Sequence, residues 1–136
     1  MSGVKVYLLF PGNADEALGF YQRIFGGELR LHSYAEFGRG DGPGTAIAHG
    51  ILDGPVPLYG ADAGPDEDAV HMAGMFLSLL GAAEPATLHR WFEALADGGR
   101  VVEPLEARAW GASDGQLVDR YGIRWLVGYE AAEPAA

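Results

Sequence analysis

The sequence of 136 residues contains no cysteine and few basic residues. Because it has no thiol, disulfides, cysteine nucleophiles and cysteine-ligated zinc or iron–sulfur centres are excluded. Nine lysine and arginine residues against 19 aspartate and glutamate residues give a formal net charge of −10, which disfavours binding to nucleic acid or to an anionic membrane. No run of about 18 apolar residues occurs, and the chain does not begin with the pattern of a signal peptide. We therefore expect a cytoplasmic protein with neither a membrane nor a nucleic acid as its partner.

What is present is typical of a folded globular protein. Hydrophobic residues make up 49% of the sequence and charged residues 21%, a balance that argues against a disordered chain. The length is suitable for one domain, or for two small modules that share a core.

The first half predicts a strand, a helix and three further strands. The first strand is expected at residues 4–10, which are rich in β-forming residues. Asn13 is a candidate N-cap, apolar residues follow it at helical spacing, and Gly26-Gly27 ends the helix. Residues 38–44 form a glycine-rich loop. The three further strands are expected at residues 28–37, 45–52 and 55–61.

The second half predicts the same order of elements. A strand at residues 75–80 precedes a helix that begins at Glu84-Pro85 and ends before Gly98-Gly99. One face of this helix is apolar, with Leu88, Trp91, Phe92 and Leu95 at helical spacing. Three strands then follow, at residues 101–108, 116–119 and 123–129.

The repeated order is an internal repeat, which defines the expected fold class. Tyr21 and Ile24 of the first helix align with Phe92 and Leu95 of the second. The sequence therefore predicts an α+β fold in which two tandem βαβββ modules form a single domain. Module one is expected at residues 4–62, a linker at 63–73, module two at 74–130 and a tail at 131–136.

Several motifs carry a closer likeness. Phe10-Pro11-Gly12-Asn13-Ala14-Asp15-Glu16-Ala17 opens the first half, Ala48-His49-Gly50 lies in its third strand, and Trp110-Gly111 precedes Asp119-Arg120-Tyr121-Gly122-Ile123 near the end. In this order and spacing they resemble the vicinal oxygen chelate superfamily, which includes glyoxalases, bleomycin-resistance proteins and dioxygenases, and in particular its PhnB-like branch. The resemblance extends over nearly the whole chain, roughly from Val4 to Glu130.

The resemblance implies cupped mixed sheets with the helices on the outside and a pocket that usually holds a divalent metal. Its ligand positions, carried over to this sequence, fall near Val6, Leu58, Phe76 and Leu126. Aliphatic and phenyl carbons donate no lone pair, so the usual metal site cannot form there. We expect no cofactor and no metal site, with a rearranged divalent-metal site as the alternative.

His49 is the first candidate for chemistry. If Asp53-Gly54 is the centre of a tight hairpin turn, His49 lies opposite Leu58 and shares its face. The resemblance implies that Leu58 faces the cavity, so His49 is expected to point into the cup, where it could be an acid, a base or a ligand anchor. Alternatively, it is a core histidine bonded to a backbone carbonyl. The same register places Asp62 opposite Thr45 at the rim, where its carboxylate could orient the imidazole or could simply cap the strand.

Other side chains are candidates for lining the pocket. Trp110 could stack on a planar ligand from its glycine-flanked loop, or could cover the core. Phe10, Leu126 and the rim carboxylate Glu130 share the expected pocket side, although core packing and tail solvation are alternatives for Phe10 and Glu130. The opposite strand parity places Tyr7, Tyr59 and Trp125 in the core. The remaining histidines occur singly and are not expected in a site: His32, His71 and His89.

Two functions of different class follow. The first is a PhnB-like protein of unassigned activity that binds a small apolar or aromatic molecule in the cup without the usual metal. The alternative is a glyoxalase-like or related enzyme in which His49 acts with Asp62 or Glu130, as acid and base or as ligands of a rearranged metal site. Each module has a helix for only one face of its sheet, so the other face must meet its twin module or a second chain. Because a chain of 136 residues leaves each cup partly open, we also expect a homodimer that buries the remaining apolar surface.

Overall fold

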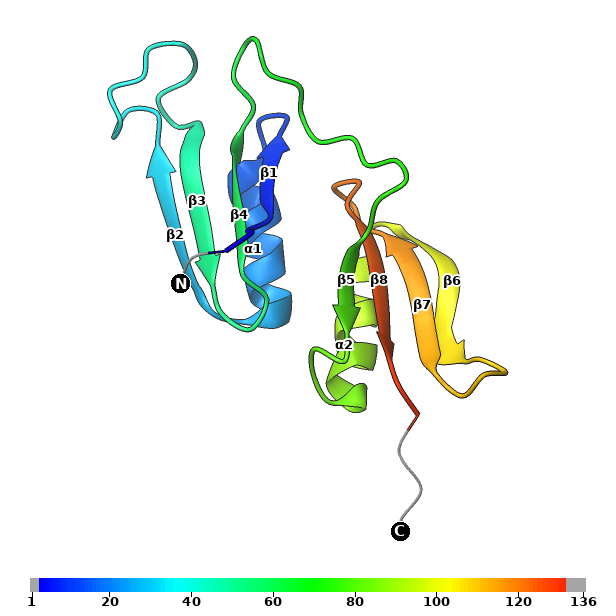
Figure 1. Ribbon diagram of the computed structural model, residues 1–136. Helices are drawn as coiled ribbons and strands as arrows, with labels where there is room; N and C mark the ends of the chain where they lie inside the picture. The colour runs from blue at the N-terminus through cyan, green and yellow to red at the C-terminus, as the bar shows by residue number, and fades with distance from the viewer. Residues whose placement is uncertain (1–2, 132–136) are drawn as a thin grey trace. The chain divides into compact units, whose positions relative to one another are not determined.

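The computed structural model describes residues 3–131, so most of the expected tail, residues 132–136, lies outside the described part. The chain divides into two compact units, Met1–Val70 and His71–Ala136. Each unit contains a four-stranded sheet and one helix (Figure 1). The predicted module and linker boundaries stay predictions at the level of single residues.

The first unit has the predicted βαβββ order, and β1 lies at one edge of its sheet. The strand order is β1-β4-β3-β2, with β1 parallel to β4 and the other pairs antiparallel. The elements are β1 (Tyr7–Phe10), α1 (Ala14–Phe25), β2 (Glu28–Ser33), β3 (Ile47–Asp53) and β4 (Leu58–Asp62).

Helix α1 packs on one face of this sheet and buries Ala17, Leu18 and Tyr21. Gly50 of β3 allows the close approach, because a Cβ there would lie 2.5 Å from Leu18 Cδ1. The helix ends at Gly26, whose φ of +81° favours glycine, as the glycine pair predicts. We call the other side of this sheet the open face.

The second unit repeats the order and the topology. The sheet order is β5-β8-β7-β6, with β5 parallel to β8. The elements are β5 (Leu77–Leu80), α2 (Pro85–Ala96), β6 (Arg100–Ala107), β7 (Ser113–Val118) and β8 (Arg124–Tyr129).

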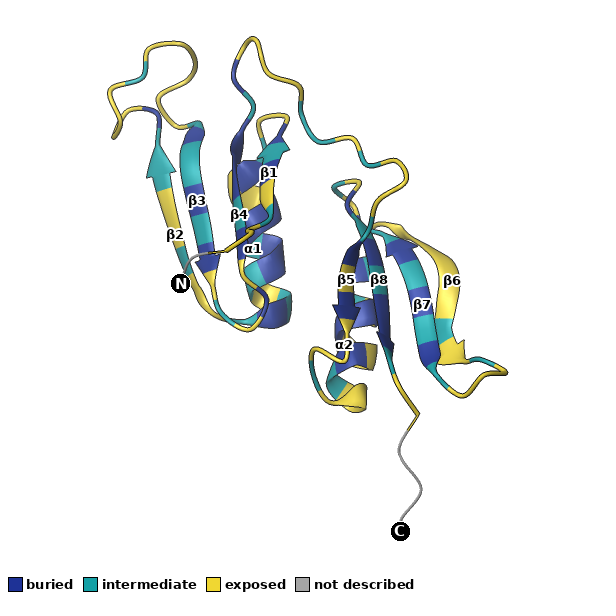
Figure 2. Cartoon of the chain, viewed as in Figure 1, coloured by how far each residue is buried: buried dark blue, intermediate teal, exposed yellow. Residues whose placement is uncertain are grey.

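The core of the second unit lies between α2 and its sheet, where Figure 2 shows buried residues. The four predicted apolar residues of α2 are buried, and Trp125 is 1% exposed, as its strand parity predicts. Buried Asp119 organises the β7–β8 turn: it accepts the Tyr121 and Ile123 backbone N–H groups and the Trp125 indole N–H. These bonds satisfy a carboxylate that would otherwise be costly to bury.

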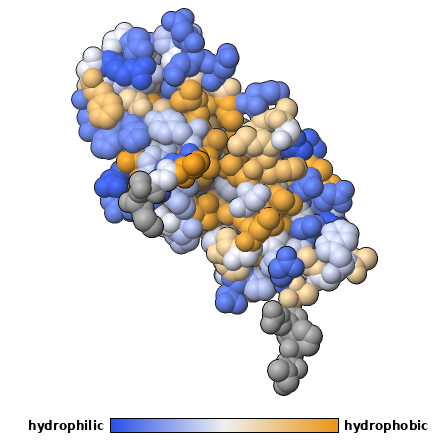
Figure 3. Space-filling model, in the orientation of Figure 1, coloured by the Kyte–Doolittle hydropathy of each residue, from blue (hydrophilic) through white to orange (hydrophobic). Residues whose placement is uncertain are grey.

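The structure confirms the predicted fold class, an α+β chain of two βαβββ modules with mixed sheets and one helix on each. Within residues 3–131, neither helix is long and apolar enough to cross a membrane. Hydrophobic side chains are not confined to the interior, since several of them reach the surface (Figure 3).

Candidate functional site

The open face of the first sheet carries a group of ring side chains. Residues next to Gly50 along β3 point away from α1, so His49 lies on this face. Tyr7 and Tyr59 are register partners in β1 and β4, and His32 is the partner of His49 in β2. Phe37, in the loop after β2, stacks on His32. We call Tyr7, His32, Phe37, His49 and Tyr59 the aromatic platform.

The rings of the platform contact one another in a chain. The His49 ring lies 5.6 Å from that of Tyr7 at 18°, and 6.3 Å from that of His32 at 12°. Phe37 continues the stack, 5.6 Å from His32 at 14°. The Tyr7 hydroxyl and His49 Nδ1 are hydrogen-bonded at 2.9 Å, with donor and acceptor set by the histidine tautomer. Tyr7 is 46% exposed and Phe37 53%, so aromatic surface is available to a ligand.

Two effects raise the pKa of Tyr7. Partial burial raises the pKa of the Tyr7 phenol, and the negative charge of Glu67 raises it further. The phenol therefore stays protonated near neutral pH and keeps its hydrogen bond with His49.

The predicted register of the hairpin is wrong, and so are the predicted faces of Leu58, Tyr7 and Tyr59, which rested on positions carried over from the resemblance. The ladder pairs Leu52 with Leu58, and residues 54–57 form the loop in place of a two-residue turn. The predicted and observed registers differ by an odd number of residues, so His49 and Leu58, predicted to share a face, lie on opposite faces of the sheet. Leu58, predicted to line the pocket, is 2% exposed in the core. Phe10 is 0% exposed, which agrees with core packing, the alternative stated for it above. Tyr7 and Tyr59, predicted in the core, lie on the open face.

The longer loop has a chemical reason. Pro55 and Pro57 have no N–H to donate to a ladder, so pairing of β3 with β4 cannot extend through them.

Asp62 is a structural residue here and cannot pair with His49. It is 5% exposed, and its Oδ1 accepts the Ala14 N–H at 2.9 Å while Oδ2 accepts the Ile47 N–H at 2.8 Å. These bonds place the carboxylate on the α1 side of the sheet, opposite His49. Asn13 occupies the predicted N-cap position, but its side chain makes no capping hydrogen bond, and Asp62 takes that role from a distant strand.

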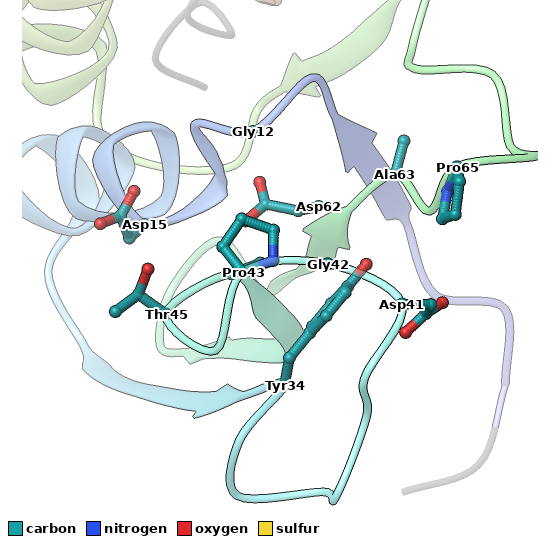
Figure 4. A pocket seen from close by; sticks show the side chains of 11 residues that line it. Gly12, Asp15, Tyr34, Asp41, Gly42, Pro43, Thr45, Asp62, Ala63 and Pro65 are labelled. Atoms are coloured by element: carbon teal, nitrogen blue, oxygen red, sulfur yellow. The ribbon is translucent and has the colours of Figure 1, made fainter.

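A cavity of about 260 Å³ lies beside Asp62 (Figure 4). Thr45, predicted to face Asp62 across the strands, lines this cavity although the two are not ladder partners. Tyr34, Asp15 and Asp41 contribute further walls. The hydrogen bond from Arg39 lowers the pKa of Asp41, which therefore stays ionised, and this lining disfavours anions.

The second unit has its own cavity, of about 310 Å³, which brings together three predicted residues. Trp110, Leu126 and Glu130 line it, with Leu80 and Tyr129 beside them. Trp110 is 74% exposed, so it does not cover the core. Two carboxylates, those of Asp114 and Glu130, line this cavity. Arg108 Nε donates a hydrogen bond of 2.8 Å to Asp114 Oδ1.

The superfamily's usual metal does not fit the positions carried over from the resemblance. Leu58 is buried beneath α1, and Val6, Phe76 and Leu126 have no donor atom. Over residues 3–131, no group of three or more histidine, aspartate or glutamate side chains is arranged to hold a metal ion.

Of the platform residues, the sequence indicated only His49; Tyr7 and Tyr59 were expected in the core, and neither Phe37 nor His32 was a candidate. His32 was excluded because it stands alone in the sequence, yet β2 places it directly opposite His49. Residues 34–46 separate the two strands, and this long loop gives no turn signal from which the register could have been found.

Comparisons with known proteins agree with this architecture. The sequence profile of the Glyoxalase/Bleomycin resistance protein/Dioxygenase superfamily matches residues 3–127. Protein YjdN of Escherichia coli strain K12 is 27% identical, with 94% of this chain and 95% of YjdN covered.

Solved structures show the same fold. Protein PA1353 from Pseudomonas aeruginosa is 33% identical and has a TM-score of 0.78, with 97% of this chain and 100% of that chain covered. A PhnB protein from Bacillus cereus has a TM-score of 0.77 over 94% of this chain and 99% of that chain, and at 22% identity this likeness shows the fold alone. The profile match and the repeated βαβββ units lead to one conclusion: the chain belongs to the Glyoxalase/Bleomycin resistance protein/Dioxygenase superfamily.

Proposed function

We propose that this PhnB-like protein binds a small apolar or aromatic molecule on the aromatic platform, without the superfamily's usual metal. The observation that carries the proposal is the chain of stacked rings on the open face, with Tyr7 and Phe37 about half exposed. Planar molecules gain about 0.5–1.5 kcal/mol from each well-placed aromatic contact beyond the burial of their surface.

Polar atoms at the platform can orient the ligand. The Tyr7 hydroxyl and the His49 ring are held together by their hydrogen bond, so their positions are fixed before a ligand arrives. The net charge of −10 favours neutral or cationic ligands over anionic ones.

A titration with planar probes tests the proposal. Indole, naphthalen-2-ol and acridine are added to the full chain, and binding is followed by NMR shifts of the platform residues. A single site with the largest shifts at His49 and Phe37 is expected. Phe37→Ala should raise Kd about 3- to 10-fold, because one stacking contact is lost.

Two further variants locate the site. Met75→Ala removes an exposed apolar side chain of the second unit and should leave Kd unchanged. Phe37→Ala/Tyr59→Ala should weaken binding more than Phe37→Ala alone. Equal Kd values for the double variant and the wild type contradict the proposal, and a loss of binding in Trp110→Ala instead assigns the ligand to the second cavity.

A second candidate function is acid–base catalysis by His49, which the Tyr7 hydrogen bond favours. Tyr7 takes the place expected for Asp62, whose oxygens are occupied by backbone N–H groups, while Glu130 lies in the second unit. The hemithioacetal of methylglyoxal and glutathione is the probe, followed by the absorbance of the thioester product. The binding proposal expects no turnover; turnover that is lost in His49→Gln supports the enzyme instead.

A further inference from the structure

Two histidines that are distant in the sequence meet on the open face of the first sheet. The antiparallel register of β2 and β3 pairs His32 directly with His49. Directly opposite residues in such strands have Cβ atoms about 4.5–5.5 Å apart. The two rings are stacked with their centroids 6.3 Å apart, so both side chains must rotate to bring their nitrogens to one ion at the usual metal–nitrogen distance of about 2.0–2.1 Å.

The Nδ1 atom of each imidazole already has an oxygen partner. His32 Nδ1 lies 2.9 Å from Glu36 Oε1, and His49 Nδ1 lies 2.9 Å from the Tyr7 hydroxyl oxygen. When each Nδ1–H donates to its oxygen, the Nε2 lone pair is free to bind a cation. Metal-binding histidines generally use their second nitrogen in this way, which fixes the tautomer and orients the ring.

The surroundings allow a cation to enter. The His32 side chain is 33% exposed and that of Glu36 is 51% exposed. Glu36 places a negative charge beside His32, and the whole chain carries a formal charge of −10. A divalent cation is therefore attracted to this edge of the platform.

We propose that His32 and His49 form a two-histidine site for a divalent transition metal of the Cu²⁺, Ni²⁺ or Zn²⁺ type, bound through their Nε2 atoms. Imidazole ligands suit these metals, and affinity should follow the order in which Cu²⁺ exceeds Ni²⁺ and Zn²⁺. Because residues 3–131 place no third histidine, aspartate or glutamate at the pair as a ligand, water fills the remaining coordination positions.

This site differs from the superfamily's usual one. The usual positions, carried over by the resemblance, are apolar, whereas the pair lies on β2 and β3. The proposal goes beyond the proposed function because it needs no organic ligand. Phe37 distinguishes the two proposals experimentally, since its ring contributes to stacking but has no atom that binds a metal.

The test is a calorimetric titration of Ni²⁺ and Zn²⁺, each alone, into the full chain without an affinity tag. One metal per chain is expected. His32→Gln and His49→Gln should each weaken binding at least tenfold, because one imidazole alone chelates nothing. Glu36→Gln should weaken binding about tenfold through the loss of the charged partner of His32.

Two matched controls accompany these variants. His71→Gln removes an exposed histidine of the second unit and should leave metal affinity unchanged. Phe37→Ala should weaken the planar probes while sparing the metal, so failure of this proposal and failure of the proposed function are distinguishable. Unchanged affinity in both His32→Gln and His49→Gln overturns the two-histidine site.

A measurement on the unaltered chain covers the case in which a variant fails to fold. Substoichiometric Cu²⁺ broadens NMR signals close to the ion. The ring signals of His32 and His49 should broaden first, before those of His71 and His89. Broadening that begins at His71 or His89 contradicts the proposal.

Discussion

Asp62 illustrates how a single polar residue can serve as structure where the sequence leaves a catalytic role open. Its carboxylate joins the start of α1 to the start of β3 through two backbone N–H groups. Both oxygens are held by backbone N–H groups on the α1 side of the sheet, so the carboxylate cannot reach His49 on the open face to exchange a proton. The negative charge also lies at the positive end of the α1 dipole, which favours it there.

Replacing Asp62 should therefore destabilise the fold. In Asp62→Ala the two buried N–H groups lose their acceptors, and we expect the free energy of unfolding to fall by about 3 kcal/mol. Urea denaturation followed by circular dichroism measures this. The control Asp66→Ala, at an exposed position, should stay within about 0.5 kcal/mol of the wild type. An equally small change in Asp62→Ala contradicts the capping role.

Tyr7 offers a second prediction at this scale, for alkaline pH. Its pKa is raised in the folded chain by burial and by Glu67, so the folded state keeps the phenolic proton more tightly than the unfolded state. The associated stability is complete below the unfolded pKa of about 10 and is lost as the pH rises through the folded value.

The difference in tyrosinate absorbance between the wild type and Tyr7→Phe isolates this group among the six tyrosines. A midpoint above that of free tyrosine is expected. Glu67→Gln should move the midpoint back toward the ordinary value. A midpoint at or below the ordinary value contradicts the assignment.

At the scale of elements, the distance between α1 and its sheet depends on Gly50. A Cβ at this position would lie 2.5 Å from Leu18 Cδ1 and 3.1 Å from Leu31 Cδ2. Leu18 of α1 is fully buried, so its methyl group has little room to move, and the Gly60 carbonyl oxygen lies 3.3 Å from the added Cβ. Leu31 is 36% exposed and can turn away more easily.

Gly50→Ala should consequently cost about 1–3 kcal/mol of unfolding free energy, the usual range for overpacking a core. Gly40→Ala is the matched control, since no atom lies within 4 Å of the added Cβ and its φ is not positive. We expect that variant to be neutral or slightly stabilised. Thermal unfolding of both variants tests this prediction. Equal melting temperatures for Gly50→Ala and Gly40→Ala would contradict it, because they would show that α1 accommodates the added methyl group without loss of stability.

At the scale of the whole molecule, apolar side chains remain at the surface. Leu80 is 59% exposed, Trp110 74%, and Val101 and Val102 of β6 46% and 38%. Each helix covers one face of its sheet, so part of the apolar surface has no cover within its own unit. The homodimer expected from the sequence would bury such surface, and it stays a prediction.

Sedimentation equilibrium over a range of protein concentrations tests the homodimer. We expect a monomer–dimer equilibrium whose dissociation constant decreases as salt is added, because salt screens the repulsion between two chains of charge −10. Leu80→Glu and Val101→Glu should weaken the dimer if their surfaces take part. A monomer at every concentration and salt level contradicts the prediction.

The sequence alone determined the order of the elements, the buried face of α2 and the ends of both helices. These depend on local periodicity and on glycine conformation, which neighbouring residues specify. It did not determine the register of β3 on β4, because Asp53-Gly54 is a strong turn signal while Pro55 and Pro57, just beyond it, extend the loop. An odd error in register changes which residues share a face, so His49 and Leu58 lie on opposite faces although they were predicted on one. The faces of Leu58 and Tyr59 were wrong for another reason, because they rested on ligand positions carried over from the resemblance.

The pairing of His32 with His49 could not be predicted from the sequence either. It depends on how β2 and β3 align across the loop of residues 34–46, and no short-range preference fixes that alignment. Likewise, only the packed fold brings Asp62 to the start of α1, where its carboxylate accepts the Ala14 N–H. Local chemistry thus determined which elements form, and the tertiary structure decided which side chains share a face, because strand alignment is set by contacts between distant segments.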